Sequence, residues 1–303
     1  FLWFGWNGGA FHLTNLALHL LTTWTLFYAA LELFGLTVLE AGLTAVAFGL
    51  AASHEYNLTV DTARADILVT LFLLLTLLTT TRRGWWMRVL SPLLFALALC
   101  SKEIAIVGIP LVFLMDRYET SGRRIVTTMR QRVVRTLPHL AVGVLFALYH
   151  AQFTAPVSES QPITAEATHS VAALLRNGAY GLGYVLLPLD LAQATAIITA
   201  HRALLFALAA SGAMLALVLL AKSVRGRTRD LLGPALWTLA TGSVVLLTFE
   251  RWRVYGPSAG VVVLAIVTVV RLPRGALRNV VALLGVALLC FHLTRGRAAQ
   301  LEW

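Results

Sequence analysis

Apolar stretches of roughly 20 residues recur along this chain, and they constrain its fold more than any other feature. A helix needs about that length to cross the hydrocarbon core of a bilayer. Hydrophobic residues make up 58% of the 303 residues and charged residues only 13%, whereas soluble domains carry about 25% charged residues. The sequence therefore predicts an all-α fold, a polytopic transmembrane helix bundle of about ten spans. The predicted spans are 11–34, 37–53, 66–81, two within 87–116, 137–154, 203–221, 231–249, 257–270 and 279–294.

Arginine placement predicts the topology of the bundle. The formal net charge is +10, but the arginines cluster in four loops rather than on one continuous face, which argues against nucleic acid as a partner. Basic loops face the cytoplasm in membrane proteins, so we expect the intervening loops on the outer side. The basic loops are 82–88, 117–135, 225–229 and 271–278, and the outer loops are 54–66, 101–103, 155–170 and 250–256.

The remaining organisation is simple. Residues 170–202 must cross twice or not at all, and their glycines and Arg176 favour an interfacial or re-entrant helix broken before Pro188. With no linker or repeat in view, we expect one membrane-embedded domain over residues 1–303, truncated at both ends. Arginine greatly outnumbers lysine, a bias common in bacterial genomes of high GC content, which favours a bacterial inner (plasma) membrane.

The first polar candidates are His12, Asn15 and His19, which lie on one face of the first predicted helix because their spacing is i, i+3 and i+7. A polar stripe in lipid must face protein or a cavity. One interpretation is hydrogen bonding between helices, which is common in membrane bundles. The other is a polar lining for a bound ligand.

The densest ionisable cluster follows the second predicted span and contains His54, Glu55, Asp61, Arg64 and Asp66. Arg64 and Asp66 stand at the mouth of an apolar run, where burial of charge is costly, so they are expected to pair with each other or with something bound. The functional interpretation is that the carboxylates position a sugar and the Arg64 guanidinium holds a phosphate. The alternative is a solvated loop with an ion pair at a helix end.

A second outer cluster is Lys102-Glu103, between two apolar segments that otherwise lack charge, and the polar Ser101-Lys102-Glu103 predicts a helix break there. A lysine ammonium is a compact positive charge that suits binding of a phosphate. Glu103 can orient the Lys102 side chain or pair with another cation. The alternative is a pair that extends to the interface and marks the helix end.

The third outer cluster runs from Glu250 to Ser258 and includes Arg251, Trp252, Arg253 and Tyr255. Arginine is disfavoured on the outer side, and an anionic lipid headgroup or lipid-linked phosphate explains the exception. Alternatively, Glu250 neutralises one arginine while the aromatic rings anchor the helix at the interface.

Five segments resemble motifs of the polytopic GT-C glycosyltransferases, in the protein O-mannosyltransferase-like group whose membrane domain precedes tetratricopeptide repeats. Phe11–His19 resembles the FHxxNxxxH opening of a helix, and Arg64–Leu68 resembles the R-A-D-x-L start of another. Ser101–Glu103 with Pro110 and Asp116 resembles the S-K-E helix pair. Glu250–Ser258 resembles E-R-x-x-Y-x-P-S, and Thr294–Trp303 resembles the segment before the repeats. The segments occur in the family's order and extend over most of the chain.

The resemblance implies a membrane enzyme that transfers a sugar, such as mannose, from a polyprenyl- or dolichyl-phosphate donor to an acceptor hydroxyl of a protein or glycan on the outer, periplasmic side. It implies donor-phosphate contacts from Arg64, Lys102 and Arg251, to which the third cluster adds Arg253. The supporting carboxylates are Asp66, Glu103 and Glu55. The aromatic and polar lining comprises Tyr255, Trp252, His54, His12, Asn15 and His19.

The chain departs from the family at two points. The family has a proline after the histidine of its second outer loop, where this chain has Glu55 after His54. Its catalytic acid lies in an earlier outer loop, which we expect upstream of Phe1, so no catalytic base is assigned. No cofactor is evident, and no ligand set supports the divalent metal known in the superfamily. The other functional classes are a transporter or flippase for a lipid-linked or anionic substrate, and a non-catalytic membrane module.

Overall fold

The computed structural model describes residues 8–60, 63–82, 84–115, 117–118, 124–125, 127–153, 232–247 and 251–271, with isolated residues between 174 and 185 and between 275 and 290. Over these residues the fold is all-α, which confirms the predicted class. The predicted span 203–221 lies outside the described residues, as do most of 279–294 and of 170–202.

The helices follow one another with short connections. The first group is α1 (Gly8–Glu32), α2 (Val38–Gly49), the 3-10 turn η1 (Ala52–His54), α3 (Glu55–Thr59) and α4 (Arg64–Thr80). The second is α5 (Trp85–Ser101), the 3-10 turn η3 (Glu103–Val107), α6 (Gly108–Leu114) and α7 (Met129–Phe153). The third is α11 (Leu232–Leu247), the 3-10 turn η5 (Arg251–Val254) and α12 (Tyr255–Arg271). A two-residue strand pair, β1 (Arg117–Tyr118) and β2 (Arg124–Ile125), joins α6 to α7.

Most helices begin and end within a few residues of the predicted stretches, because apolar runs bounded by polar residues delimit both. Helix α7 is an exception, since it begins eight residues before the predicted span at 137. Thr128 accepts a hydrogen bond from the backbone N–H of Gln131 (3.3 Å), and the Gln131 side chain accepts one from the N–H of Thr128 (2.9 Å). This reciprocal capping box starts the helix ahead of its apolar part.

The number of spans is a different matter from the number of helices. Within the described ranges, one helix, Met129–Gln152, is long and apolar enough to cross a membrane. Helices α2, α5 and α12 are apolar but have 12, 17 and 17 residues, whereas a span needs roughly 20. The expectation of about ten spans is therefore unsupported by the helix lengths.

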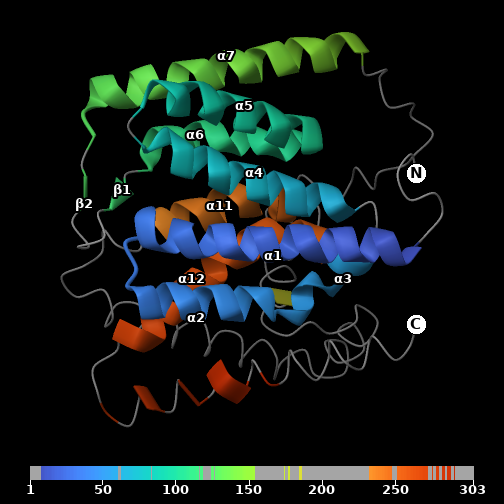
Figure 1. Ribbon diagram of the computed structural model, residues 1–303, viewed down its shortest axis with the longest axis vertical. Helices are drawn as coiled ribbons and strands as arrows, with labels where there is room; N and C mark the ends of the chain where they lie inside the picture. Colours follow the sequence, from blue (N-terminus) through green and yellow to red (C-terminus); the bar gives the residue numbers. More distant parts are fainter. Residues whose placement is uncertain are drawn as a thin grey trace.

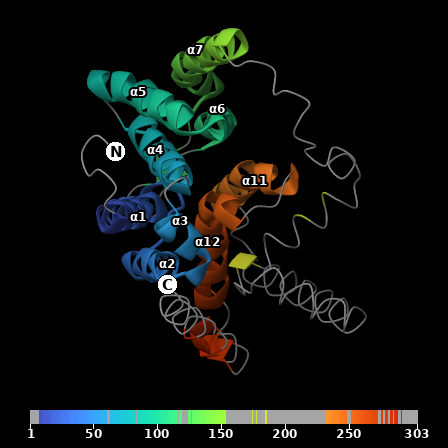
Figure 2. The same cartoon turned by 90° about the vertical axis from the view of Figure 1, so that its right-hand side faces the viewer.

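The helices pack in two layers, and α11 and α12 are inclined to α1 and α2 (Figures 1 and 2). Neighbours in contact follow the order α7, α5, α4, α1 and α2 in one layer. The second layer holds α6, α11 and α12, which contact the first through α7, α4 and α2. We call the end of the bundle where α4 begins and α5 stops the Lys102 end. The opposite end, where α1 and α4 stop and α5 begins, is the Arg82 end.

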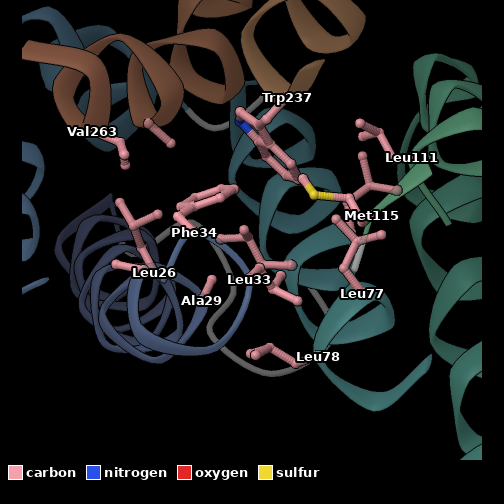
Figure 3. Close-up of a cluster of buried hydrophobic side chains, with 14 of the residues drawn as sticks. Leu26, Ala29, Leu33, Phe34, Leu77, Leu78, Leu111, Met115, Trp237 and Val263 are labelled. Carbon is pink, nitrogen blue, oxygen red and sulfur yellow. The ribbon is translucent and has the colours of Figure 1, made fainter. Parts of the chain in front are cut away.

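The core lies between the two layers and is built from Leu, Phe and Ala side chains around Trp237 (Figure 3). The Trp237 indole N–H donates to the carbonyl of Gly256 (2.8 Å), which ties α11 to the first turn of α12. At Gly260 the same two helices approach so closely that an added Cβ would lie 2.9 Å from the Pro234 carbonyl oxygen. This contact fixes the position of α12, which carries Tyr255 and Ser258.

Candidate functional site

Polar side chains from helices far apart in sequence meet at the Lys102 end. They come from the first turns of α1, from η1 and α3, from the start of α4, from the α5–η3 junction and from the start of α12. The predicted site residues that make hydrogen bonds or ion pairs here are His12, Asn15, His19, His54, Arg64, Asp66, Lys102 and Tyr255.

Arg64 and Asn15 join the start of α4 to α1. The Arg64 Nε–H donates to Asn15 Oδ1 (2.6 Å), and the guanidinium carbon lies 5.3 Å from the centroid of the Phe11 ring. The Asn15 amide donates in turn to the carbonyls of Asn57 (3.4 Å) and Leu58 (3.3 Å), which belong to the short helix α3. The last carbonyls of a helix lack partners within it, so the buried Asn15 satisfies them while it orients Arg64.

Asp66 pairs with Lys102 rather than with Arg64. The Lys102 ammonium lies 2.9 and 2.7 Å from the two carboxylate oxygens, and the side chains are 16% and 8% exposed for lysine and aspartate. Lys102 has an extended backbone (φ −164°, ψ 139°) between α5 and η3. The helix break predicted at Ser101–Glu103 is therefore present, and it places the ammonium beside the first turn of α4.

The third group is a buried network of two histidines, a tyrosine and a serine. The Tyr255 hydroxyl and His19 Nδ1 are 2.7 Å apart, and His19 Nε2 lies 3.1 Å from the Gly49 carbonyl. On the other side, His54 Nε2 lies 2.8 Å from Ser258 Oγ, which donates to the Tyr255 carbonyl (2.7 Å). The rings of His19, His54 and Tyr255 pack on one another and on Phe48.

The network has a definite hydrogen-bond direction. A carbonyl oxygen only accepts, so Nε2 of His19 carries the proton that Gly49 receives, and Nδ1 accepts from the tyrosine hydroxyl. Ser258 gives its hydroxyl proton to the Tyr255 carbonyl, so its oxygen accepts from His54 Nε2–H. Both ring nitrogens of His19 thus have hydrogen-bond partners in the neutral form, in a site that is buried from solvent.

The other predicted site residues take less central places. His12 is exposed, and its Nδ1 lies 3.4 Å from the Leu58 carbonyl. Glu103 is exposed at the start of η3, Glu55 is half-buried at the start of α3, and Arg253 is half-buried in η5. Arg251 and Trp252 contribute backbone to η5, and their side chains lie outside the described residues, as do Asp61 and Glu250.

Sequence reasoning did not assign a role to Asn57, Phe48 or Ser258. Asn57 is buried and donates to the Ala63 carbonyl (3.4 Å), which bridges α3 to the start of α4. Ser258 stands in the motif that begins at Glu250, so a signal was present, but its partner His54 lies 204 residues earlier. Nothing in the sequence distinguishes Phe48 from the other apolar residues of its helix.

A separate polar cluster lies near the Arg82 end and was not predicted. Ser91 of α5 donates to the Thr76 carbonyl (3.0 Å) and lies 2.8 Å from His139 Nε2 of α7, with Thr80 beside both. His139 Nδ1 lies 3.0 Å from the Arg135 carbonyl one turn earlier in its own helix. Ser91 and His139 are both buried, and with the Thr76 carbonyl they join α4, α5 and α7.

The Lys102 end can bind an anion through the Arg64 guanidinium and the Lys102 ammonium, with the Asp66 carboxylate paired to the ammonium. An ammonium has three N–H donors and a guanidinium five, and bonds to described residues engage two of each in Lys102 and Arg64. Donors therefore remain for phosphate oxygens. Within the described ranges, no group of three His, Cys, Asp or Glu side chains is placed to hold a metal ion.

Comparisons with models of known protein families, with curated proteins and with solved structures give no match for this chain.

Proposed function

We propose that this chain is the membrane domain of a GT-C-type glycosyltransferase that takes its sugar from a polyprenyl- or dolichyl-phosphate donor. In this proposal the Lys102 end faces the outer, periplasmic side of a bacterial inner membrane, and its cations hold the donor phosphate. The acceptor is a hydroxyl of a protein or glycan. The full bundle then crosses the membrane several times, with the arginine-rich loops in the cytoplasm.

The observation that carries the proposal is the convergence of Arg64 and Lys102 at one end of the bundle. They lie 38 positions apart in sequence, Arg64 at the start of α4 and Lys102 between α5 and η3, yet each is oriented by a hydrogen-bonded partner on another element. Charges are expensive at the ends of apolar helices and are usually retained for a binding or transport role. An oriented guanidinium and an oriented ammonium at the same end of the bundle suit a phosphate-bearing ligand.

The outward faces of the helices support a lipid environment. Large apolar side chains are exposed along α1, α2, α5 and α7, and in water a contiguous surface of this kind marks an interaction site. Trp85 and Trp86 lie exposed at the first turn of α5, at the Arg82 end. Tryptophan collects at the boundary between membrane and water, so this position suits one interface of the bilayer.

Chemically, the cations act on the leaving group. Departure of the sugar places negative charge on the donor phosphate, and Arg64 and Lys102 stabilise that charge more as it develops. Asp66 keeps the Lys102 ammonium at its position while the site is empty. In this proposal a carboxylate takes the proton of the acceptor hydroxyl. We do not assign that general base to any of the described residues.

Binding to the purified full chain in detergent tests the proposal directly. The probes are a polyprenyl phosphate and the matching polyprenol, which lacks the phosphate. We expect the phosphate lipid to bind at least about tenfold more tightly, an advantage of about 1.4 kcal/mol. Separate Lys102→Gln and Arg64→Gln variants should lose that advantage. Arg82→Gln is the matched control, because it removes a carboxylate-paired arginine at the opposite end.

Two results would overturn the proposal. Equal binding of the two lipids, or unchanged phosphate preference in both the Lys102 and Arg64 variants, would remove the phosphate site. Uptake of the lipid-linked sugar into proteoliposomes without covalent transfer would instead favour a transporter or flippase. Transfer of a radiolabelled sugar from its polyprenyl phosphate to an acceptor, lost in the same variants, is the outcome that the glycosyltransferase proposal predicts.

A further inference from the structure

We infer that Tyr255 is a positioning residue of the donor-phosphate site, which acts by holding η5 against α1 through His19; this inference rests on the proposed function. The turn η5 carries Arg251 and Arg253 and runs directly into Tyr255. It contacts η1 and α3 at the Lys102 end. A cation in such a turn is useful to a ligand only if the turn has one fixed position.

Tyr255 supplies two separate attachments at the junction of η5 and α12. Its hydroxyl donates to His19 of α1. Its carbonyl accepts from Ser258, whose oxygen is in turn held by His54 of η1. One residue therefore fixes η5 to both α1 and η1.

The far side of the network is anchored on backbone. His19 Nε2 donates to the Gly49 carbonyl at the end of α2, which packs against α1. An added Cβ at Gly49 would lie 3.2 Å from Thr23 Cγ2 of α1. Since backbone does not change rotamer, the chain from Tyr255 to Gly49 holds the turn more firmly than a contact between two mobile side chains.

The roles of the two nitrogen atoms in His19 suggest a discriminating substitution. His19 uses one acceptor and one donor, and a glutamine amide offers the same pair. If His19 only positions Tyr255, His19→Gln retains function and His19→Leu does not. If His19 exchanges protons with a ligand, both substitutions fail equally.

The experiment compares Tyr255→Phe, His19→Gln and His19→Leu in the full-length chain, with Tyr28→Phe of α1 as a control for removal of a tyrosine hydroxyl. Affinity for polyprenyl phosphate and for polyprenol is measured together with amide hydrogen exchange over residues 251–254. We expect Tyr255→Phe and His19→Leu to weaken phosphate-lipid binding about tenfold, as for the loss of one buried hydrogen bond. Exchange in η5 should accelerate by a similar factor.

His19→Gln and Tyr28→Phe should retain wild-type affinity and exchange. Combining Tyr255→Phe with His19→Leu should be no worse than either change alone, because residues that act as one unit are not additive. Wild-type affinity in Tyr255→Phe, or equal losses in His19→Gln and His19→Leu, would overturn the inference while the phosphate preference of the wild type stands. If the wild type does not prefer the phosphate lipid, the proposed function fails first and the inference with it.

Discussion

The two ends of the bundle use polar side chains for different purposes. At the Arg82 end they mostly satisfy backbone: Arg132 and Arg135 donate to the carbonyls of Phe113, Leu114 and Met115 that end α6. The Thr37–Glu40 capping box likewise starts α2. These bonds are explained by the requirement that helix ends find partners.

At the Lys102 end, side chains bond to side chains across helices, as in Arg64–Asn15, Lys102–Asp66 and His19–Tyr255. Such pairs are not needed to complete a helix, and a buried ion pair is weak evidence of a stabilising role. The comparison teaches that polarity alone does not identify a site in this chain. Side-chain pairs between helices also occur near the Arg82 end, in Ser91–His139 and Arg82–Glu32, so what distinguishes the Lys102 end is its two oriented cations, Arg64 and Lys102.

The largest effect is expected from Lys102→Met, which leaves the buried Asp66 carboxylate without its ammonium. Removing one partner of a buried pair costs about 3 kcal/mol of unfolding free energy. Chemical denaturation in detergent measures it. Lys102→Met combined with Asp66→Leu should recover most of the stability but no phosphate-lipid binding. Full loss of stability in the double variant would show that Lys102 supports the fold by contacts other than the ion pair.

The second-largest effect is expected from Asn15→Leu, which should lower the free energy of unfolding by about 2 kcal/mol. The change leaves the Arg64 Nε–H and the Asn57 and Leu58 carbonyls without their amide partner. The segment 50–60 should then become more susceptible to limited proteolysis. The matched change Thr14→Val, one position away on the same helix, removes only a bond to the Ala10 carbonyl. Equal effects of the two changes would break the distinction between interhelical and local hydrogen bonds.

Ser91→Ala tests the Arg82 side of the comparison. It removes the hydroxyl that joins α5 to His139 of α7 and should lower stability by about 1 kcal/mol. Phosphate-lipid affinity should not change, because the cluster lies away from the Lys102 end. A loss of affinity as large as that of Tyr255→Phe would mean that the two ends are coupled.

The smallest effect is expected from Arg82→Gln, which removes the pair with Glu32 (2.7 Å). The Arg82 side chain is 39% exposed, and exposed pairs contribute at most about 1 kcal/mol, less at high salt. Thermal unfolding at low and high salt should show a small difference that disappears as salt rises. A loss comparable to that of Lys102→Met would contradict the contrast drawn between the ends.

The helices could be predicted from the sequence because the apolar stretches are long and polar residues interrupt them. The break at Ser101–Glu103 is one example, and the extended Lys102 backbone confirms it. The early start of α7 depends on a cap rather than on hydropathy. The pattern Thr128-x-x-Gln131 was visible in the sequence, but the apolar run that defined the span begins later.

Pairing within the site could not be predicted in the same way. Arg64 and Asp66 are neighbours in sequence, yet residues two apart on a helix do not face each other. Each therefore bonds to a different helix. The partners lie 49 and 36 positions away for Arg64–Asn15 and Lys102–Asp66, and only the packing of the helices brings them together.

Photocrosslinking tests the central claim, a phosphate-lipid site at the Lys102 end, most directly. The full chain in lipid nanodiscs would be labelled with a polyprenyl phosphate that carries a photoreactive group beside the phosphate, and the adducts mapped by mass spectrometry. The proposal predicts adducts within residues 8–19, 52–66, 101–107 and 251–258, competed by unlabelled polyprenyl phosphate but not by polyprenol. Adducts confined to the Arg82 end, or labelling that polyprenol competes equally well, would contradict it.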